Sequence, residues 1–144
     1  MTQETNAKAI SEQAVSVPNG SLDAYIIDCF AKPPMLIPQN IVLSALDSRV
    51  SETKITWHDR TLPVFHVNHP DQKNGIALVV EGDKVEERFI LMCDKMPEPI
   101  RLSIAKVTDV DEKNIDPSIL YFVKFSDQVY HVPNFFYIQH KLGL

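Results

Sequence analysis

Short apolar runs recur about every ten residues along most of the chain, and Pro or polar turn residues separate them. The runs are rich in Val, Ile, Phe and Tyr, which favour strands, and they are too short for long amphipathic helices. This pattern predicts an all-β fold, either a sandwich or a barrel. We expect strands over residues 25–30, 35–37, 41–46, 55–57, 62–67, 76–80, 89–93, 100–104, 107–110, 119–125 and 129–132.

The two ends of the chain differ from this pattern. Residues 1–21 are mostly polar and are expected to form a flexible N-terminal tail, so that residues 22–144 make up the folded domain. Near the C-terminus, Asn134 is a favourable N-cap for a short helix over residues 135–142. Gly143 is a favourable residue to end that helix.

Composition excludes several classes of function. The net charge is −5, whereas nonspecific binding to nucleic acid or to an anionic membrane requires clustered Lys and Arg. No apolar run is long enough to insert in a bilayer and no signal-peptide pattern begins the chain, so we expect a cytoplasmic protein. Phosphate-binding loops and the GxSxG motif are missing, which excludes P-loop NTPases, Rossmann enzymes and α/β-hydrolases. The four glycines are far apart: Gly20, Gly75, Gly82 and Gly143.

The two cysteines, Cys29 and Cys93, lie in separate apolar runs and form no CxxC motif. A catalytic cysteine needs exposure and an electropositive setting. Buried thiols in a reducing compartment therefore explain the two positions better than a nucleophile does.

Three histidines, His58, His66 and His69, are the densest group of potential metal ligands. Their spacing matches no common zinc motif, so we expect no metal, no cofactor and no catalytic residue. The alternative function that these residues leave open is a β-barrel that binds a small molecule or a metal through this region.

The segment from Trp57 to Arg60 combines the single tryptophan with an adjacent charged turn. Trp and Arg are favoured at interface hot spots because each combines a large contact area with a polar group. A large aromatic residue is also a common anchor of the core, so the residues alone leave both interpretations open.

The order of the motifs resembles the CheW-like adaptor domain of chemotaxis signalling, in particular the ChpC-like branch of type IV pilus chemosensory systems. The resemblance covers most of residues 22–144 and is carried by Leu36-Ile37-Pro38, Leu62-Pro63-Val64, the run from Phe89 to Asp94 and the C-terminal helix. It implies two small linked five-stranded β-barrels and no enzymatic activity.

The same resemblance implies a scaffold in a twitching-motility pathway. Its partners would be a chemotaxis-type histidine kinase and the cytoplasmic tip of a methyl-accepting chemoreceptor. A regulatory module of a kinase, without the catalytic domains, is a third possibility.

The family motif Asn-Leu-Arg-Gly falls on Thr56 to Asp59 when the sequences are aligned on Pro63, so the signalling Arg of the family is His58 here. The partner-binding residues expected from this comparison and from the Trp–Arg chemistry are Trp57, His58, Asp59, Arg60 and Leu62. Residues 100–110 are the alternative surface.

Overall fold

The computed structural model describes residues 20–144, and within this range the chain is mostly β with one α-helix. All the expected strands are present, with shifted ends, so the prediction of an all-β chain with a short C-terminal helix is confirmed. The strands are β1 (Ser21–Ile27), β2 (Met35–Pro38), β3 (Val42–Arg49), β4 (Lys54–Trp57), β5 (Arg60–His66), β6 (Asn74–Val80), β7 (Phe89–Cys93), β8 (Glu98–Ser103), β9 (Thr108–Val110), β10 (Ile119–Phe125) and β11 (Gln128–Pro133). The helix is α2 (Phe135–Lys141), and the short 3₁₀ helices are η2 (Gln39–Ile41), η3 (Val85–Glu87) and η4 (Ile104–Lys106).

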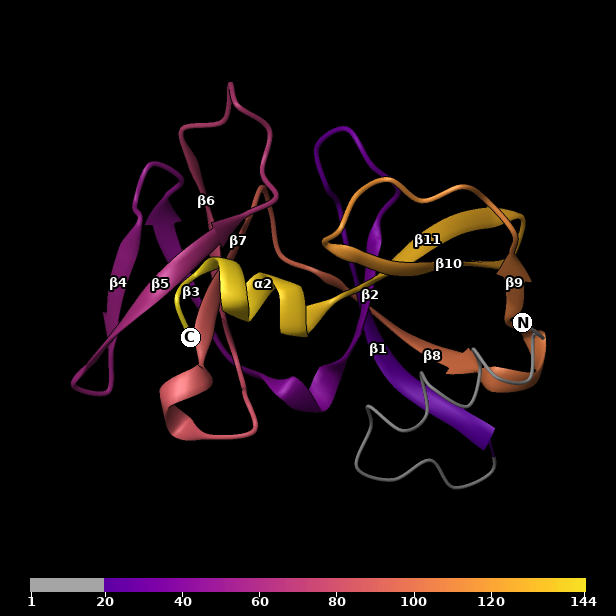
Figure 1. Ribbon diagram of the computed structural model, residues 1–144, viewed down its shortest axis with the longest axis horizontal. Helices are drawn as coiled ribbons and strands as arrows, with labels where there is room; N and C mark the ends of the chain where they lie inside the picture. Colours follow the sequence, from indigo (N-terminus) through magenta and orange to yellow (C-terminus); the bar gives the residue numbers. More distant parts are fainter. Residues whose placement is uncertain (1–19) are drawn as a thin grey trace.

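The strands form two sheets that stand side by side, with α2 between them in the view of Figure 1. Sheet A has six strands in the order β8-β1-β2-β11-β10-β9, and sheet B has five in the order β3-β6-β7-β5-β4. Two sets of five were expected. The chain begins in sheet A, builds all of sheet B and then returns to complete sheet A.

Strands β6 and β7 lie in the middle of sheet B and are apolar on both faces, because each face covers a separate cluster. Successive side chains of a strand point to opposite faces. Leu78, Val80, Phe89 and Leu91 accordingly face the gap between the two sheets. The alternating residues Ala77, Val79, Ile90 and Met92 face the opposite side of sheet B, where they belong to a second group of buried residues that we call the cluster of sheet B.

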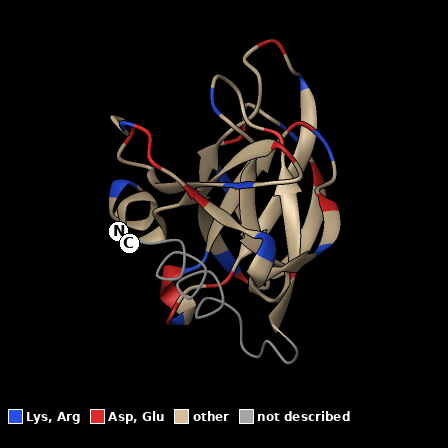
Figure 2. Ribbon diagram, turned by 90° about the vertical axis from the view of Figure 1, so that its right-hand side faces the viewer, with Lys and Arg blue, Asp and Glu red and all other residues tan. Residues whose placement is uncertain are grey.

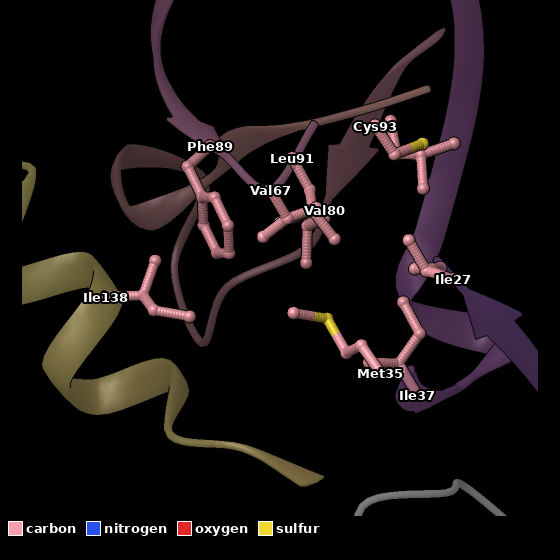
Figure 3. Packing of buried hydrophobic residues seen from close by; sticks show 10 residues of the cluster. Ile27, Met35, Ile37, Val67, Val80, Phe89, Leu91, Cys93 and Ile138 are labelled. Atoms are coloured by element: carbon pink, nitrogen blue, oxygen red, sulfur yellow. The ribbon is translucent and has the colours of Figure 1, made fainter. Parts of the chain in front are cut away.

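We call the cluster between the sheets the central cluster. Figure 3 shows side chains from β1 and β2 of sheet A lying opposite those of β6 and β7, with Ile138 of helix α2 at the edge. A fully buried side chain of this kind contributes about 1.5–3 kcal/mol, so this layer is a large part of the stability. Its buried members are Ile27, Met35, Ile37, Val67, Leu78, Val80, Phe89, Leu91, Cys93 and Ile138.

Sheet A also has a cluster of its own on the face away from the central cluster. Eight buried residues form it: Leu22, Ala24, Leu36, Leu102, Val107, Val123, Tyr130 and Val132. Charged residues lie mainly in loops, turns and strand ends, with both signs interspersed, while most of the strand interiors are uncharged (Figure 2). The sequence pattern of short half-buried and fully buried strands follows from these three clusters.

One expected strand end is wrong. Strand β1 begins at Ser21, and residues 1–19 of the expected tail lie outside the described range. The strand ends at Ile27 and not at residue 30, because Ala31 has a φ of 60° and the chain turns there. Cys29 therefore lies after the strand and is only half-buried.

Helix α2 forms as expected. The side chain of Asn134 accepts a hydrogen bond from the backbone N–H of Tyr137 at 3.1 Å, which caps the first turn. At the other end Gly143 has a φ of 84°, which a residue without Cβ adopts at no steric cost.

A parallel pairing between β2 and β11 joins the two halves of sheet A, and in it His131 lies opposite Met35. The backbone N–H of His131 donates to the carbonyl of Pro34 at 2.9 Å, and its ring Nδ1 donates to the carbonyl of Pro33 at 2.7 Å. The imidazole is fully buried, and its Nε2 has no hydrogen-bond partner among residues 20–144. Burial lowers the pKa of His131 from 6.5 to about 4, although the bond to Pro33 opposes this shift and nearby Lys32 adds to it.

We therefore expect acid to weaken the fold through His131. The unfolded chain takes up this proton near pH 6.5 and the folded chain only near pH 4, so the stabilisation is complete above pH 6.5 and is lost as the pH falls to 4. The loss amounts to about 3 kcal/mol, from 1.36 kcal/mol per pKa unit. Urea unfolding of the wild type and of His131→Gln between pH 7 and pH 4 measures it.

The His131→Gln variant should lose less stability than the wild type over this interval. The control His140→Gln removes an exposed imidazole and should keep the steep loss, because His131 is still present. Parallel curves for the wild type and His131→Gln would contradict this assignment.

Candidate functional site

The predicted interaction residues lie at the end of the hairpin formed by β4 and β5. Trp57 pairs with Arg60, and the two residues between them, His58 and Asp59, have φ values of 48° and 65°. Two left-handed residues in a two-residue loop form the tight turn that matches the twist of antiparallel strands. We call residues 57–60 the hairpin tip.

The base of this hairpin is held firmly in sheet B. Strand β5 pairs with the edge strand β4 up to Pro63 and then pairs in parallel with β7 from Val64 to His66. Leu62 and Val64 are buried in the cluster of sheet B. The hairpin tip therefore projects from a fixed support.

Trp57 is the centre of the tip. It is half-buried and packs against the cluster of sheet B, while its ring stacks on His58 with centroids 3.9 Å apart and planes 8° apart. The guanidinium of Arg88 lies 5.7 Å from the centroid of the Trp57 ring, within the range of a cation–π contact. Both interpretations of Trp57 therefore apply, because the buried part of its side chain anchors the core and the remaining part lies at the surface.

Arg88 joins the hairpin tip to the β6–β7 connection. Its Nε and a terminal nitrogen donate to the two carboxylate oxygens of Glu81 at 2.7 and 3.1 Å. This hydrogen bonding lowers the pKa of Glu81 below its usual value. Neither Arg88 nor Glu81 was predicted as a site residue, although opposite charges at the two ends of the β6–β7 connection were an available signal in the sequence.

The five predicted residues do not share one environment. His58, Asp59 and Arg60 are exposed, Trp57 is half-buried, and Leu62 is only 4% exposed. Within residues 20–144 Arg60 forms no ion pair, so its guanidinium is available to a partner. Leu62 packs in the cluster of sheet B, so it can support the hairpin but cannot contact a partner directly.

The three histidines of the alternative site have three different sets of contacts. His58 stacks on Trp57, His66 bonds through Nε2 to the carbonyl of Glu52 at 2.9 Å, and His69 pairs with the carboxylate of Asp94. In the described part of the chain no three His, Cys, Asp or Glu side chains are arranged to hold a metal ion. The structure therefore does not bring His58, His66 and His69 together as ligands.

The two thiols are held as hydrogen-bond donors. Cys29 donates to the carbonyl of Ile27 at 3.5 Å, and Cys93 donates to the carbonyls of Ile76 and Lys95 at 3.5 and 3.3 Å. Burial raises the pKa of both to about 12. Cys93 is buried as expected and Cys29 only partly, yet neither setting favours a thiolate.

One polar cluster, between the β1–β2 loop and the loop before β10, was not predicted. Lys32 bonds to Ser118 and Asp116, each at 3.2 Å, and the Ser118 hydroxyl donates to Asp116 at 2.7 Å. Ser118 is buried, and its hydroxyl proton is already committed to the carboxylate of Asp116. This arrangement joins two loops and does not present an activated nucleophile.

No model of a protein family matches the chain, and no curated protein matches it. Within residues 20–144 no helix is both long and apolar enough to cross a membrane. The chemistry of the surface must therefore be inferred from its geometry.

The turn gives a test of how the hairpin tip is held. A left-handed backbone is costly for a residue with Cβ, so Asp59→Gly should stabilise the protein by about 0.5–1 kcal/mol. Asp59→Ala keeps the Cβ and should destabilise it. The urea midpoint should be highest for Asp59→Gly, intermediate for the wild type and lowest for Asp59→Ala. A midpoint of Asp59→Gly below that of the wild type would contradict the assigned turn.

The cysteines give a second test. With a pKa of about 12, roughly 10⁻⁴ of either thiol is ionised at pH 8, and iodoacetamide reacts with the thiolate. Mass spectrometry should therefore show slow labelling in the native protein, slower at Cys93 than at Cys29, and fast labelling of both in urea. Native labelling of Cys29 at the unfolded rate would indicate a reactive role.

Proposed function

We propose that the chain is a noncatalytic adaptor of the CheW-like type, and that the hairpin tip is one of its docking surfaces. The observation that supports this most directly is the arrangement of Trp57, His58 and Arg60 at one hairpin tip, where Trp57 and Arg60 pair and Trp57 stacks on His58. A surface that is already ordered loses little conformational entropy when a partner binds. Trp and Arg are also the residues that contribute most often to binding energy.

The fold proposed with this function is a pair of small linked β-barrels. Each sheet has a separate apolar cluster on one face, and the central cluster lies between the sheets. Two barrels packed against each other would have this distribution of apolar side chains. The five strands of sheet B fit the expected number, whereas sheet A has one more.

The proposed partners are a chemotaxis-type histidine kinase and the cytoplasmic tip of a methyl-accepting chemoreceptor, within a type IV pilus signalling pathway in the cytoplasm. The motifs that support this assignment are Leu36-Ile37-Pro38 and Leu62-Pro63-Val64, which end β2 and lie within β5. Both motifs place apolar residues in the clusters and a proline where antiparallel pairing ends.

We expect Arg60→Ala to weaken binding to one of these partners without unfolding the protein. A hot-spot Arg contributes about 1–3 kcal/mol to binding, whereas an exposed charge contributes about 0–1 kcal/mol to stability. Isothermal titration against the kinase regulatory domain and against the receptor tip measures the first quantity. A thermal melt measures the second.

The matched control is Lys54→Ala, which removes an exposed cation from the other end of the same hairpin. It should bind as the wild type does. If the wild type binds neither partner at tens of micromolar, the adaptor assignment fails. If Arg60→Ala binds both partners normally, only the hairpin tip is excluded as a docking surface.

A further inference from the structure

A groove lies between helix α2 and the β6–β7 connection, next to the hairpin tip. Its volume is about 380 Å³, at the small end of the roughly 300–1,000 Å³ typical of ligand pockets. It can therefore accept one or two side chains but not a folded element. Seven residues line it: Ile41, Glu81, Gly82, Asp83, Phe135, Phe136 and Gln139.

The most unusual of these residues is Phe136, which is 82% exposed. Exposed apolar side chains that lie together along a groove mark interaction sites, whereas ones scattered singly over a surface do not. Two exposed apolar residues, Leu43 and Val85, are close in sequence to Ile41 and Asp83 of the groove lining.

Phe136 is held in place by its neighbours in α2. The ring of Phe135 packs on Phe89 with centroids 6.0 Å apart, and Ile138 is fully buried in the central cluster. Gln139 donates from its amide nitrogen to the carbonyl of Glu87 at 3.2 Å, which ties the helix to the β6–β7 connection. The exposed aromatic ring therefore stands on a fixed helix and not on a loose chain end.

The charged residues that line the groove are both acidic. Its lining contains two carboxylates, Glu81 and Asp83, and no Lys or Arg. Arg88 already pairs with Glu81, whereas Asp83 is exposed and forms no ion pair within residues 20–144. An occupant with an apolar side chain and a cationic side chain would complement this surface, because each finds an unpartnered group of the matching kind.

We propose that this groove binds a cationic, apolar segment of a partner protein, with a large apolar side chain against Phe136 and a Lys or Arg against Asp83. The proposal rests on the adaptor function, because an adaptor needs one surface for each of two partners and the hairpin tip supplies only one. Arg88 lies between the two surfaces, in contact with both Trp57 and Glu81.

A second copy of the chain fits the groove less well. Apposing two such grooves by a twofold axis would bring Asp83 and Glu81 of one copy near the same carboxylates of the other. Like charges in apposition weaken an interface. The sign of the charges therefore favours a different protein as the occupant.

The test uses a fluorescein-labelled peptide of about 18 residues that contains both Leu and Lys, titrated into the full chain. A second peptide carries Glu in place of every Lys. We expect the Lys peptide to bind at least tenfold more tightly than the Glu peptide. We also expect Phe136→Ser to weaken binding of the Lys peptide at least tenfold and Asp83→Asn to weaken it a few-fold.

Leu120→Ser is the matched control, since Leu120 is an exposed apolar residue of β10, in the other sheet. It should leave the affinity unchanged, as should Arg60→Ala, which separates failure of the groove from failure of the hairpin tip. Phe136→Ser should melt as the wild type does, because the side chain is exposed. Equal binding by Phe136→Ser and wild type, equal binding of both peptides, or a wild-type dimer in sedimentation that Phe136→Ser dissociates would each overturn the proposal.

Discussion

The structure depends on one apolar layer that both sheets share. Strands β6 and β7 are buried on both faces, so sheet B is stable only when sheet A and helix α2 cover the side that carries Leu78, Val80 and Phe89. Sheet A has the same requirement through Ile27 and Met35. The positions of the hairpin tip and of the groove beside α2 both follow, because each is supported by strands or a helix that pack on this layer.

Features with a local cause could be predicted from the sequence. The strands follow from short apolar runs, including the adjacent runs at residues 119–125 and 129–132 that form β10 and β11. Asn134 and Gly143 predict the two ends of α2, because the side-chain cap of Asn134 and the left-handed backbone of Gly143 each depend on one residue. The hairpin tip was found because its turn and its aromatic residue are adjacent in the chain.

Features that join distant segments could not be predicted. The parallel pairings of β5 with β7 and of β2 with β11 depend on which apolar strand reaches which edge, and no single segment encodes this. The contact of Arg88 with Trp57 has the same origin. Leu62 was expected at the surface as one of the predicted partner-binding residues, yet strand alternation turns it into the cluster of sheet B. His131 was overlooked because an isolated histidine in a strand carries no sign of burial.

The path of the chain through the two sheets also determines the order in which they can be completed on the ribosome. Residues 42–93 contain every strand of sheet B in one continuous stretch, so that sheet can pair soon after it emerges. The hairpin of β1 and β2 is synthesised earlier but obtains its neighbours β8 and β11 only later. During that interval its apolar faces and unpaired edges are open, and a nascent chain in that state is a substrate for chaperones that bind exposed strands.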